Sequence, residues 1–483
     1  MKRKSGVLLH ISSLPSGYGI GNLGKWAYKF VDMLSEGGFS VWQVLPICMP
    51  DGYNSPYKSR ASFSVNPYFI DIDTLVDRGY LTEEDRESAR ETGEYVAEYS
   101  TLARKRLPLL QKAAQRAYED KVLLSAVEEF ISENECIANA ARFLALSEER
   151  GGAPWQIWKG AKPDPVRLFF WQFVQFEFHR QWQKLKKYAN SKGIEIIGDL
   201  PMYVDLDSAD VWYSPEFFQL DSAGFPTSLA GVPPDAFSKD GQLWGNPLYN
   251  YDEMKKDGFS FWRRRIEYAL QMFDGVRIDH FRAFEAYWSI PRDAKSAKEG
   301  EWIPGPGREI IDAIKEVAGD KLVIAEDLGV ITDEVRELLE YSGMPGMRVL
   351  QFGFTEGNTS PHLPHNFPEK CVAYTGTHDN NTTLGALYEL TDEQKRRVAD
   401  YLCTDPCNVN QLTKASICAV LRSKAELSVI PLQDILGYGK DTRMNIPGNA
   451  RENWAYRVAP WQLESLDIAN MRYMNELFGR ISD

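Results

Sequence analysis

The 483-residue sequence contains no run of about 18 apolar residues, so no segment is long and apolar enough to cross a membrane as a helix. The apolar stretch from Gly6 to Leu9 is too short for the hydrophobic core of a signal peptide. Acidic residues outnumber basic ones, and the formal charge of −13 disfavours nucleic acid and anionic membranes, because both require a basic surface. We therefore expect a cytoplasmic protein that binds neither nucleic acid nor membranes.

Cysteine is scarce and shows no regular framework. Cys403 and Cys407 have C-x3-C spacing, but no neighbouring pair of Cys or His residues completes a metal site. We expect reduced, mostly buried thiols, and neither a metal nor a cofactor. The six cysteines are Cys48, Cys136, Cys371, Cys403, Cys407 and Cys418.

Aromatic residues are plentiful, at 12% of the chain, with 13 Trp and 23 Tyr. A large core accounts for most of them. An aromatic face can also cover the C–H face of a sugar while its polar edge stays in water, and a sugar-binding groove would use only a minority of these residues. Composition alone does not separate the two uses.

Short apolar runs rich in β-branched residues recur along the chain, and most are followed by a helical pattern. Continuous apolar character is typical of strands buried on both faces of a parallel sheet. Eight strand–helix units predict an α/β fold with a closed (β/α)8 barrel; a doubly wound open sheet is the alternative, although no G-x-G-x-x-G follows any strand. The predicted strands lie near Gly6–His10, Val41–Pro46, Ile194–Leu200, Gly275–Asp279, Leu322–Glu326, Arg348–Phe352, Val372–Thr375 and Leu427–Leu432.

We expect one catalytic barrel over residues 1–483, with two insertions and no separate C-terminal β-domain. Residues from about 71 to 167 are charged and helix-forming, which predicts a helical subdomain inserted after the second strand. Residues from about 201 to 251 are rich in Pro, Gly and aromatic residues and show little periodicity. Long irregular loops are usually functional, so this segment, which follows the third strand, is a candidate substrate-binding subdomain. Helices are also predicted over 259–272 and 332–341, the second with Thr332 as its N-cap.

Carboxylates stand at the ends of four predicted strands: Asp199, Asp279, Glu326 and Asp379. In barrel enzymes the reactive residues come from these strand ends and the loops that follow them. A single Asp after a strand is most often a helix N-cap, but that explanation does not extend easily to four corresponding positions.

Asp279 and Glu326 are the natural pair for glycoside chemistry of the retaining type. This chemistry needs a carboxylate nucleophile and a second, protonated carboxyl about 5–5.5 Å away, and neighbouring strands lie about 5 Å apart. Arg277 precedes Asp279 by two positions, so both side chains point to the same side of the strand. We expect Arg277 to hold Asp279 ionised and to lower its pKa; a simple salt bridge is the alternative for this pair.

Eight segments in order along the chain strengthen this interpretation: HISSLPSGYGIGNLG (10–24), SPYKSRASFSVNPY (55–68), GDLPMYV (198–204), PPDAFSKDGQLWGNPLY (233–249), FDGVRIDHF (273–281), IAEDLG (324–329), GTHDNNT (376–382) and RMNIPG (443–448). Together they resemble the amylomaltase, or 4-α-glucanotransferase, family, a branch of the α-amylase superfamily. The resemblance extends from the first strand almost to the end of the chain. It implies transfer of α-1,4-glucan segments between maltooligosaccharides, or glucans derived from starch or glycogen, by a retaining mechanism that needs no metal.

The resemblance also implies roles for individual residues. Asp279 is the expected nucleophile, Glu326 the acid/base and Asp379 the stabiliser of the transition state. Loop packing is an equal alternative for Trp244, and His280 is expected to pack against the strand end. Sugar contacts are implied for Tyr57, Asp199, Arg277, His378 and Asn445, and for Gln242 and Trp244 on the acceptor side.

Two other functions fit the same carboxylates. An α-glucan hydrolase would use the same barrel and would differ only in admitting water to the intermediate. Hydrolases of the superfamily usually carry an Asn-His pair after the third strand, whereas here Leu200 and Pro201 follow Asp199, which favours a transferase. A non-catalytic glucan-binding protein is the second alternative, but it would have no need of a buried acid beside a buried base.

Overall fold

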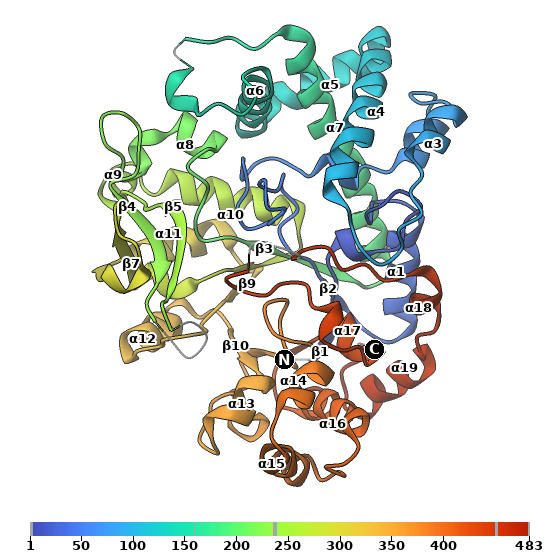
Figure 1. Cartoon of the computed structure of the whole chain (residues 1–483), viewed down its shortest axis with the longest axis vertical. Helices are drawn as coiled ribbons and strands as arrows, with labels where there is room; N and C mark the ends of the chain where they lie inside the picture. Colours follow the sequence, from blue (N-terminus) through green and yellow to red (C-terminus); the bar gives the residue numbers. More distant parts are fainter. Residues whose placement is uncertain (1–2, 159, 235–238, 450–452, 482–483) are drawn as a thin grey trace.

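Eight parallel strands close into a barrel at the centre of the computed structural model, which describes residues 3–158, 160–234, 239–449 and 453–481 (Figure 1). The order around the barrel is β1-β12-β11-β10-β9-β6-β3-β2, so each of these strands pairs with the next one along the chain. The predicted closed barrel is therefore confirmed, and an open sheet is excluded. The strands are β1 (Lys4–Leu8), β2 (Val41–Gln43), β3 (Glu195–Leu200), β6 (Gly275–Ile278), β9 (Leu322–Ala325), β10 (Gly346–Val349), β11 (Cys371–Tyr374) and β12 (Leu427–Pro431).

All eight predicted strands are present, with shifted ends. Every residue of β11 and β12 is buried, as the continuous apolar runs predicted. The sixth strand differs most, because β10 ends at Val349 and the following residues form helix α13 (Leu350–Glu356). A short apolar run does not by itself distinguish a strand from a helix, and the boundary was therefore misplaced.

Helices cover the outside of the barrel. The two helices named from the sequence are α10 (Ser260–Met272) and α12 (Asp333–Ser342). Thr332 is the N-cap of α12, as predicted, although its side chain makes no capping hydrogen bond. The remaining helices after β1 and from β3 to β12 are α1 (Lys25–Glu36), α8 (Ala209–Tyr213), α9 (Tyr251–Lys256), α11 (Arg308–Ala318), α14 (Thr383–Glu389), α15 (Asp392–Leu402) and α16 (Val409–Arg422).

A group of helices is inserted between β2 and β3 and lies at the top of Figure 1. The last of them, α7 (Pro165–Ser191), begins with Asp164 as its N-cap and Pro165 at its first position, and it leads back into the barrel. That the group folds as a separate subdomain stays a prediction. The other members are α2 (Ile72–Asp77), α3 (Glu83–Ala89), α4 (Tyr99–Glu119), α5 (Lys121–Glu133) and α6 (Glu135–Glu149).

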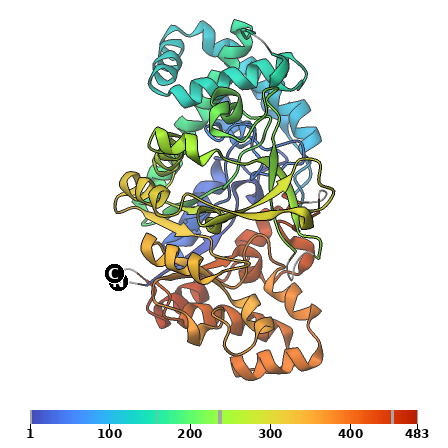
Figure 2. The same ribbon diagram turned by 90° about the vertical axis from the view of Figure 1, so that its left-hand side faces the viewer.

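The segment from 201 to 251 is less irregular than the sequence suggested. It contains α8 (Ala209–Tyr213) and two strands, β4 (Ser228–Val232) and β5 (Gln242–Pro247). These strands belong to an antiparallel sheet of order β5-β4-β7-β8, which is seen in Figure 2. Its other strands, β7 (Ala286–Pro291) and β8 (Glu301–Pro304), come from the loop after β6. The pairing of β4 with β7 joins the two halves of the sheet across segments that are distant in sequence, and local periodicity gave no sign of it.

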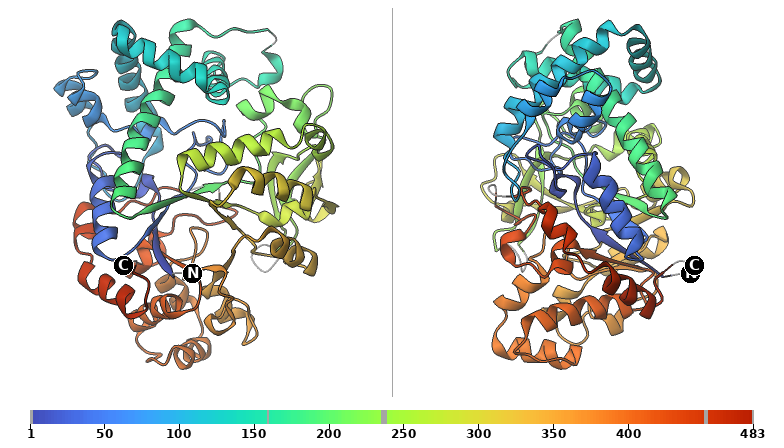
Figure 3. Two further views of the ribbon diagram at one scale, coloured as in Figure 1. Left: turned by 180° about the vertical axis from the view of Figure 1, so that it is seen from behind. Right: turned by 90° about the vertical axis from the view of Figure 1, so that its right-hand side faces the viewer.

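The end of the chain returns to its beginning. After β12 the described residues form the helices α17 (Leu432–Leu436), α18 (Pro460–Glu464) and α19 (Ile468–Leu477) and no further strand, so the described chain has no C-terminal β-domain. Arg3 donates to the carbonyl of Phe478 at 2.5 Å, and Figure 3 shows the last helices, in red, beside the blue helix α1. Within the described ranges, no helix combines the length and apolarity that crossing a membrane requires.

Candidate active site

A cleft of about 1150 Å³ lies where the barrel strands end, and its walls come mainly from the loops that follow them. This is the end of the barrel at which enzymes of this fold carry their active sites. Asp199 is the one predicted site residue outside the lining, because it is buried beneath the floor. The others all line the cleft: Tyr57, Gln242, Trp244, Arg277, Asp279, Glu326, His378, Asp379 and Asn445.

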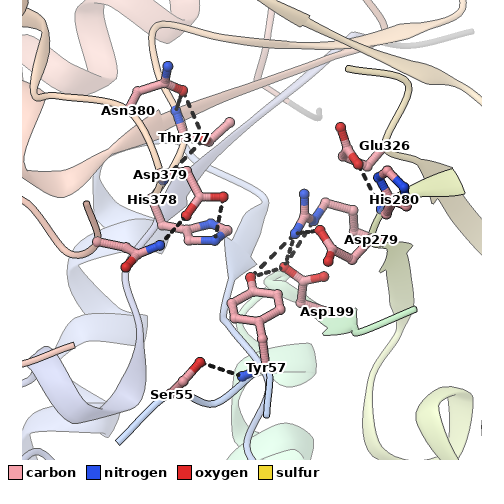
Figure 4. A network of polar contacts seen from close by, with 12 residues as sticks. Ser55, Tyr57, Asp199, Asp279, His280, Glu326, Thr377, His378, Asp379 and Asn380 are labelled. Carbon is pink, nitrogen blue, oxygen red and sulfur yellow. Dashed lines mark hydrogen bonds and ion pairs between the residues drawn. The ribbon is translucent and has the colours of Figure 1, made fainter. Parts of the chain in front are cut away.

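Arg277 is the centre of a buried polar network in the cleft floor (Figure 4). Its Nη2 lies 2.7 Å from Asp199 Oδ2 and 2.9 Å from Asp279 Oδ1. The hydroxyl of Tyr57 donates to the same oxygen of Asp199 at 2.7 Å. The register of β3 and β6 places Asp199 directly opposite Arg277. One cation therefore orients two carboxylates, and each buried charge has a partner.

Asp279 and Glu326 stand side by side because β6 and β9 are neighbours. The register pairs Ile278 with Ala325, and the two carboxylates are the residues that follow this pair. The backbone N–H of Glu326 still donates to the carbonyl of Ile278 at 3.0 Å, so the pairing extends to Glu326.

The turn after β6 positions the carboxyl group of Glu326. His280 adopts a left-handed backbone with φ 50°, which is uncommon for a residue other than glycine. Its N–H donates to Glu326 Oε2 at 2.7 Å, and the N–H of Leu328 donates to Oε1 at 2.9 Å. The His280 ring packs edge-on against Trp244, with 5.0 Å between centroids. His280 thus packs at the strand end, as expected, and it also holds Glu326, which the sequence did not indicate.

The environment separates the ionisation of the two carboxyls. Burial raises the pKa of Asp279 to about 6, and Arg277 opposes this increase only in part, because the negative charges of Asp199 and Asp379 add to it. Burial, together with the charge of Asp279, raises the pKa of Glu326 to about 8. Arg277 does lower the pKa of Asp279, as expected, but it is shared with Asp199, and burial outweighs its effect, so the net change is upward. Near pH 7, Asp279 is ionised and Glu326 is protonated.

Asp379 lies apart from this pair in Figure 4, together with His378. The Nδ2 of Asn445 donates to Asp379 Oδ1 at 2.6 Å, and His378 Nε2 lies 3.3 Å from Oδ2. Burial alone would raise the pKa of Asp379, but the charge and hydrogen bond of His378, with the hydrogen bond from Asn445, lower it below its usual range. This third carboxylate is therefore ionised whenever Asp279 is.

The loop that carries His378 and Asp379 is anchored by Asp434, which sequence reasoning missed. Asp434 is buried on α17 and accepts hydrogen bonds of 2.6 Å from the Thr375 hydroxyl and from both the backbone N–H and the hydroxyl of Thr383. These two threonines flank the loop. The signal was present, since Asp434 follows the apolar run of β12 just as the other carboxylates follow their strands.

Aromatic rings form two walls of the cleft. The ring of Tyr57 stacks on His378 at 5.1 Å, and Trp454, also missed from the sequence, lies 5.6 Å from Tyr57. On the other wall, Trp244 donates through Nε1 to Gln242 Oε1 at 3.2 Å. Trp244 both packs on a neighbour and lines the cleft, so the two alternatives for it are not exclusive. Among the described residues, no group of three or more His, Cys, Asp or Glu side chains has the arrangement to hold a metal ion.

A closed (β/α)8 barrel that gathers carboxylates and an arginine at its strand ends, with aromatic walls around them, defines an enzyme of glycoside chemistry. Comparison with known proteins gives the particular group: a family model described as 4-alpha-glucanotransferase matches residues 9–463. The chain belongs to the 4-alpha-glucanotransferase family.

Individual relatives match over the whole chain. The 4-alpha-glucanotransferase of Thermus thermophilus is 43% identical over 100% of both chains. That of Streptococcus pneumoniae is 39% identical over 100% of this chain and 98% of the relative. Among solved structures, the amylomaltase from Streptococcus agalactiae in complex with acarbose superimposes with a TM-score of 0.95, at 36% identity and with full coverage of both chains.

The two raised pKa values predict a bell-shaped dependence of kcat/KM on pH. Activity should fall below pH 6 as Asp279, whose pKa is about 6, becomes protonated. It should fall above pH 8 as Glu326, whose pKa is about 8, loses its proton. One pH unit outside each of these two pKa values, kcat/KM should be roughly tenfold below its maximum near pH 7. Initial rates from pH 4.5 to 9.5 measure this profile, with circular dichroism to show that the protein stays folded. A value of kcat/KM that does not fall between pH 6 and pH 5, or one that already falls as the pH rises past 5, would contradict the prediction.

Proposed function

We propose that this protein transfers α-1,4-glucan segments from donor to acceptor maltooligosaccharides, including chains derived from starch or glycogen, by a retaining double displacement. The 4-α-glucanotransferase activity on α-glucans follows from family membership. The mechanism rests chiefly on one observation: Asp279 and Glu326 are adjacent and differ in ionisation near neutral pH. The location in the cytoplasm stays a prediction.

In the first step, the carboxylate of Asp279 attacks the anomeric carbon of the donor. The bond from that carbon to the glycosidic oxygen breaks, and Glu326 gives its proton to the departing oxygen. A covalent glucosyl ester on Asp279 results. Arg277 keeps the attacking oxygen in place, and Asp379 with His378 holds hydroxyls of the donor sugar.

In the second step, the reaction runs in reverse with a new partner. Glu326, now ionised, takes the proton from the 4-hydroxyl of an acceptor glucan, and that oxygen attacks the anomeric carbon and displaces Asp279. Because the configuration is inverted twice, the α-linkage is retained. Gln242 and Trp244 are proposed to bind the acceptor sugar on the side of Glu326, which keeps water from the ester.

Maltotriose distinguishes transfer from the alternatives. We expect glucose together with a ladder of longer oligosaccharides, while the concentration of reducing ends stays constant, because each transfer breaks one glycosidic bond and makes another. Chromatography of the products and a reducing-sugar assay on the same samples measure both quantities. Reducing ends that rise with each bond cleaved would identify a hydrolase, and the absence of any product would identify a binding protein.

The separate roles of the two carboxyls predict different behaviour of two variants. An α-glucosyl fluoride has a leaving group that needs no acid, so Glu326→Gln should form the glucosyl ester but release it slowly. The ester should accumulate, and peptide mass spectrometry should locate one glucosyl unit on Asp279. Asp279→Asn should form no adduct, since a neutral amide is too weak a nucleophile. A sugar found on Asp379 or Asp199 would overturn the assignment of the nucleophile.

A further inference from the structure

Trp302, on strand β8 of the insertion sheet, lines the same cleft as the catalytic carboxyls but has no part in the mechanism above. Its side chain belongs to the exposed large hydrophobic residues, at 36% exposure. The guanidinium carbon of Arg282 lies 3.6 Å from the centre of its ring, and Trp288 packs against it edge-to-face at 5.0 Å. Because Arg282 covers one face of the ring, a sugar that stacks on Trp302 must use the opposite face.

Arg282 is itself fixed, so the ring rests on a rigid base. Only 4% of Arg282 is exposed, and its Nη1 donates to the carbonyl of Val330 at 2.5 Å. Its Nη2 lies 3.6 Å from a carboxylate oxygen of Glu285. A cation stacked on one face favours an ordered ring position, and little conformational freedom is left to lose when a ligand binds to the opposite face.

Trp302 lies on the wall of the cleft that belongs to Glu326. Arg282 is two residues beyond His280, whose N–H holds the Glu326 carboxyl. In the proposed reaction Glu326 serves the leaving and incoming oxygens, so this wall faces the acceptor. Trp244 and Trp302 come from β5 and β8, the opposite edges of the four-stranded sheet. Three strand spacings separate these edges, roughly 14 Å, which is too far for both rings to contact one sugar unit.

We propose that Trp302 is a specificity-determining residue, a stacking platform for an acceptor sugar more than one unit away from the bond that is formed. This inference rests on the proposed function, because it needs a glucan acceptor on the side of Glu326. A flat aromatic face covers the C–H face of a hexose through apolar contact, and this contact needs no hydrogen bond from the ring. The platform favours long acceptors over glucose, which fills only the acceptor position nearest to the bond that is formed.

The test uses α-glucosyl fluoride as donor and an acceptor series of glucose, maltose, maltotriose and maltotetraose. We expect Trp302→Ala to reduce the ratio of kcat/KM for maltotetraose to that for glucose about tenfold, with the value for glucose itself changed less than about twofold. Trp302→Phe, which keeps a smaller ring, should lose only part of the ratio. Trp461→Ala is the matched control, because Trp461 is an exposed tryptophan, at 56%, that does not line the cleft; it should leave the ratio unchanged.

The other possible results of this experiment would each overturn the role proposed for Trp302. An equal loss of kcat/KM for all four acceptors in Trp302→Ala would mean that the ring is only structural, and a ratio unchanged by the substitution would mean that no sugar stacks there; either result overturns the proposal. In both cases the glucosyl ester on Asp279 and the maltotriose ladder of the unaltered enzyme would still stand, so the proposed function would survive. If the unaltered enzyme transferred no glucosyl unit to any acceptor, the proposed function would fail, and the role of Trp302 with it.

Discussion

The site depends on an imbalance of charge in a confined space, where one arginine faces more carboxylates than it can neutralise. Arg277 is within 3 Å of both Asp199 and Asp279, and Glu326 stands beside them with backbone N–H groups as its hydrogen-bond partners. Ionising both Asp279 and Glu326 in this low-dielectric floor would place two negative charges next to each other, so one of them retains its proton. The group in contact with Arg277 ionises first. The same type of side chain is thus present as an ionised carboxylate and as a protonated acid, the two groups that the proposed retaining mechanism uses.

The barrel makes this arrangement possible because it fixes neighbouring strand ends in register. Asp199 opposes Arg277 through β3 and β6, and the Ile278–Ala325 pair of β6 and β9 brings Asp279 and Glu326 together. The loops then add what a strand end cannot provide. The left-handed turn at His280 aims an N–H at Glu326, and Asp434 fastens both ends of the loop that carries Asp379. The insertion sheet contributes the aromatic wall with Trp244 and Trp302 on its opposite edge strands.

Those parts that follow from local sequence could be predicted, and those that follow from distant pairing could not. Continuous apolar runs identified the eight barrel strands, and the polar residues at the ends of these runs identified the carboxylates. Both features can be recognised within a short stretch of sequence. The sheet β5-β4-β7-β8 was missed because its halves come from loops after different strands. The lowering effect of Arg277 on the pKa of Asp279 could be predicted from a two-residue spacing, whereas the larger, opposite effect of burial and the sharing of Arg277 with Asp199 appear only in three dimensions.

The central claim is that Glu326 keeps its proton at neutral pH because it shares a buried site with the charge of Asp279. The most direct measurement is a carbon-13 NMR titration of the Glu326 carboxyl, assigned by comparison with Glu326→Gln, in the unaltered protein and in Asp279→Asn. We expect a pKa of about 8 in the unaltered protein and a lower value in Asp279→Asn, where the neighbouring negative charge is gone while burial remains. A pKa near the ordinary 4.5 in the unaltered protein, or the same raised value in both proteins, would contradict this account.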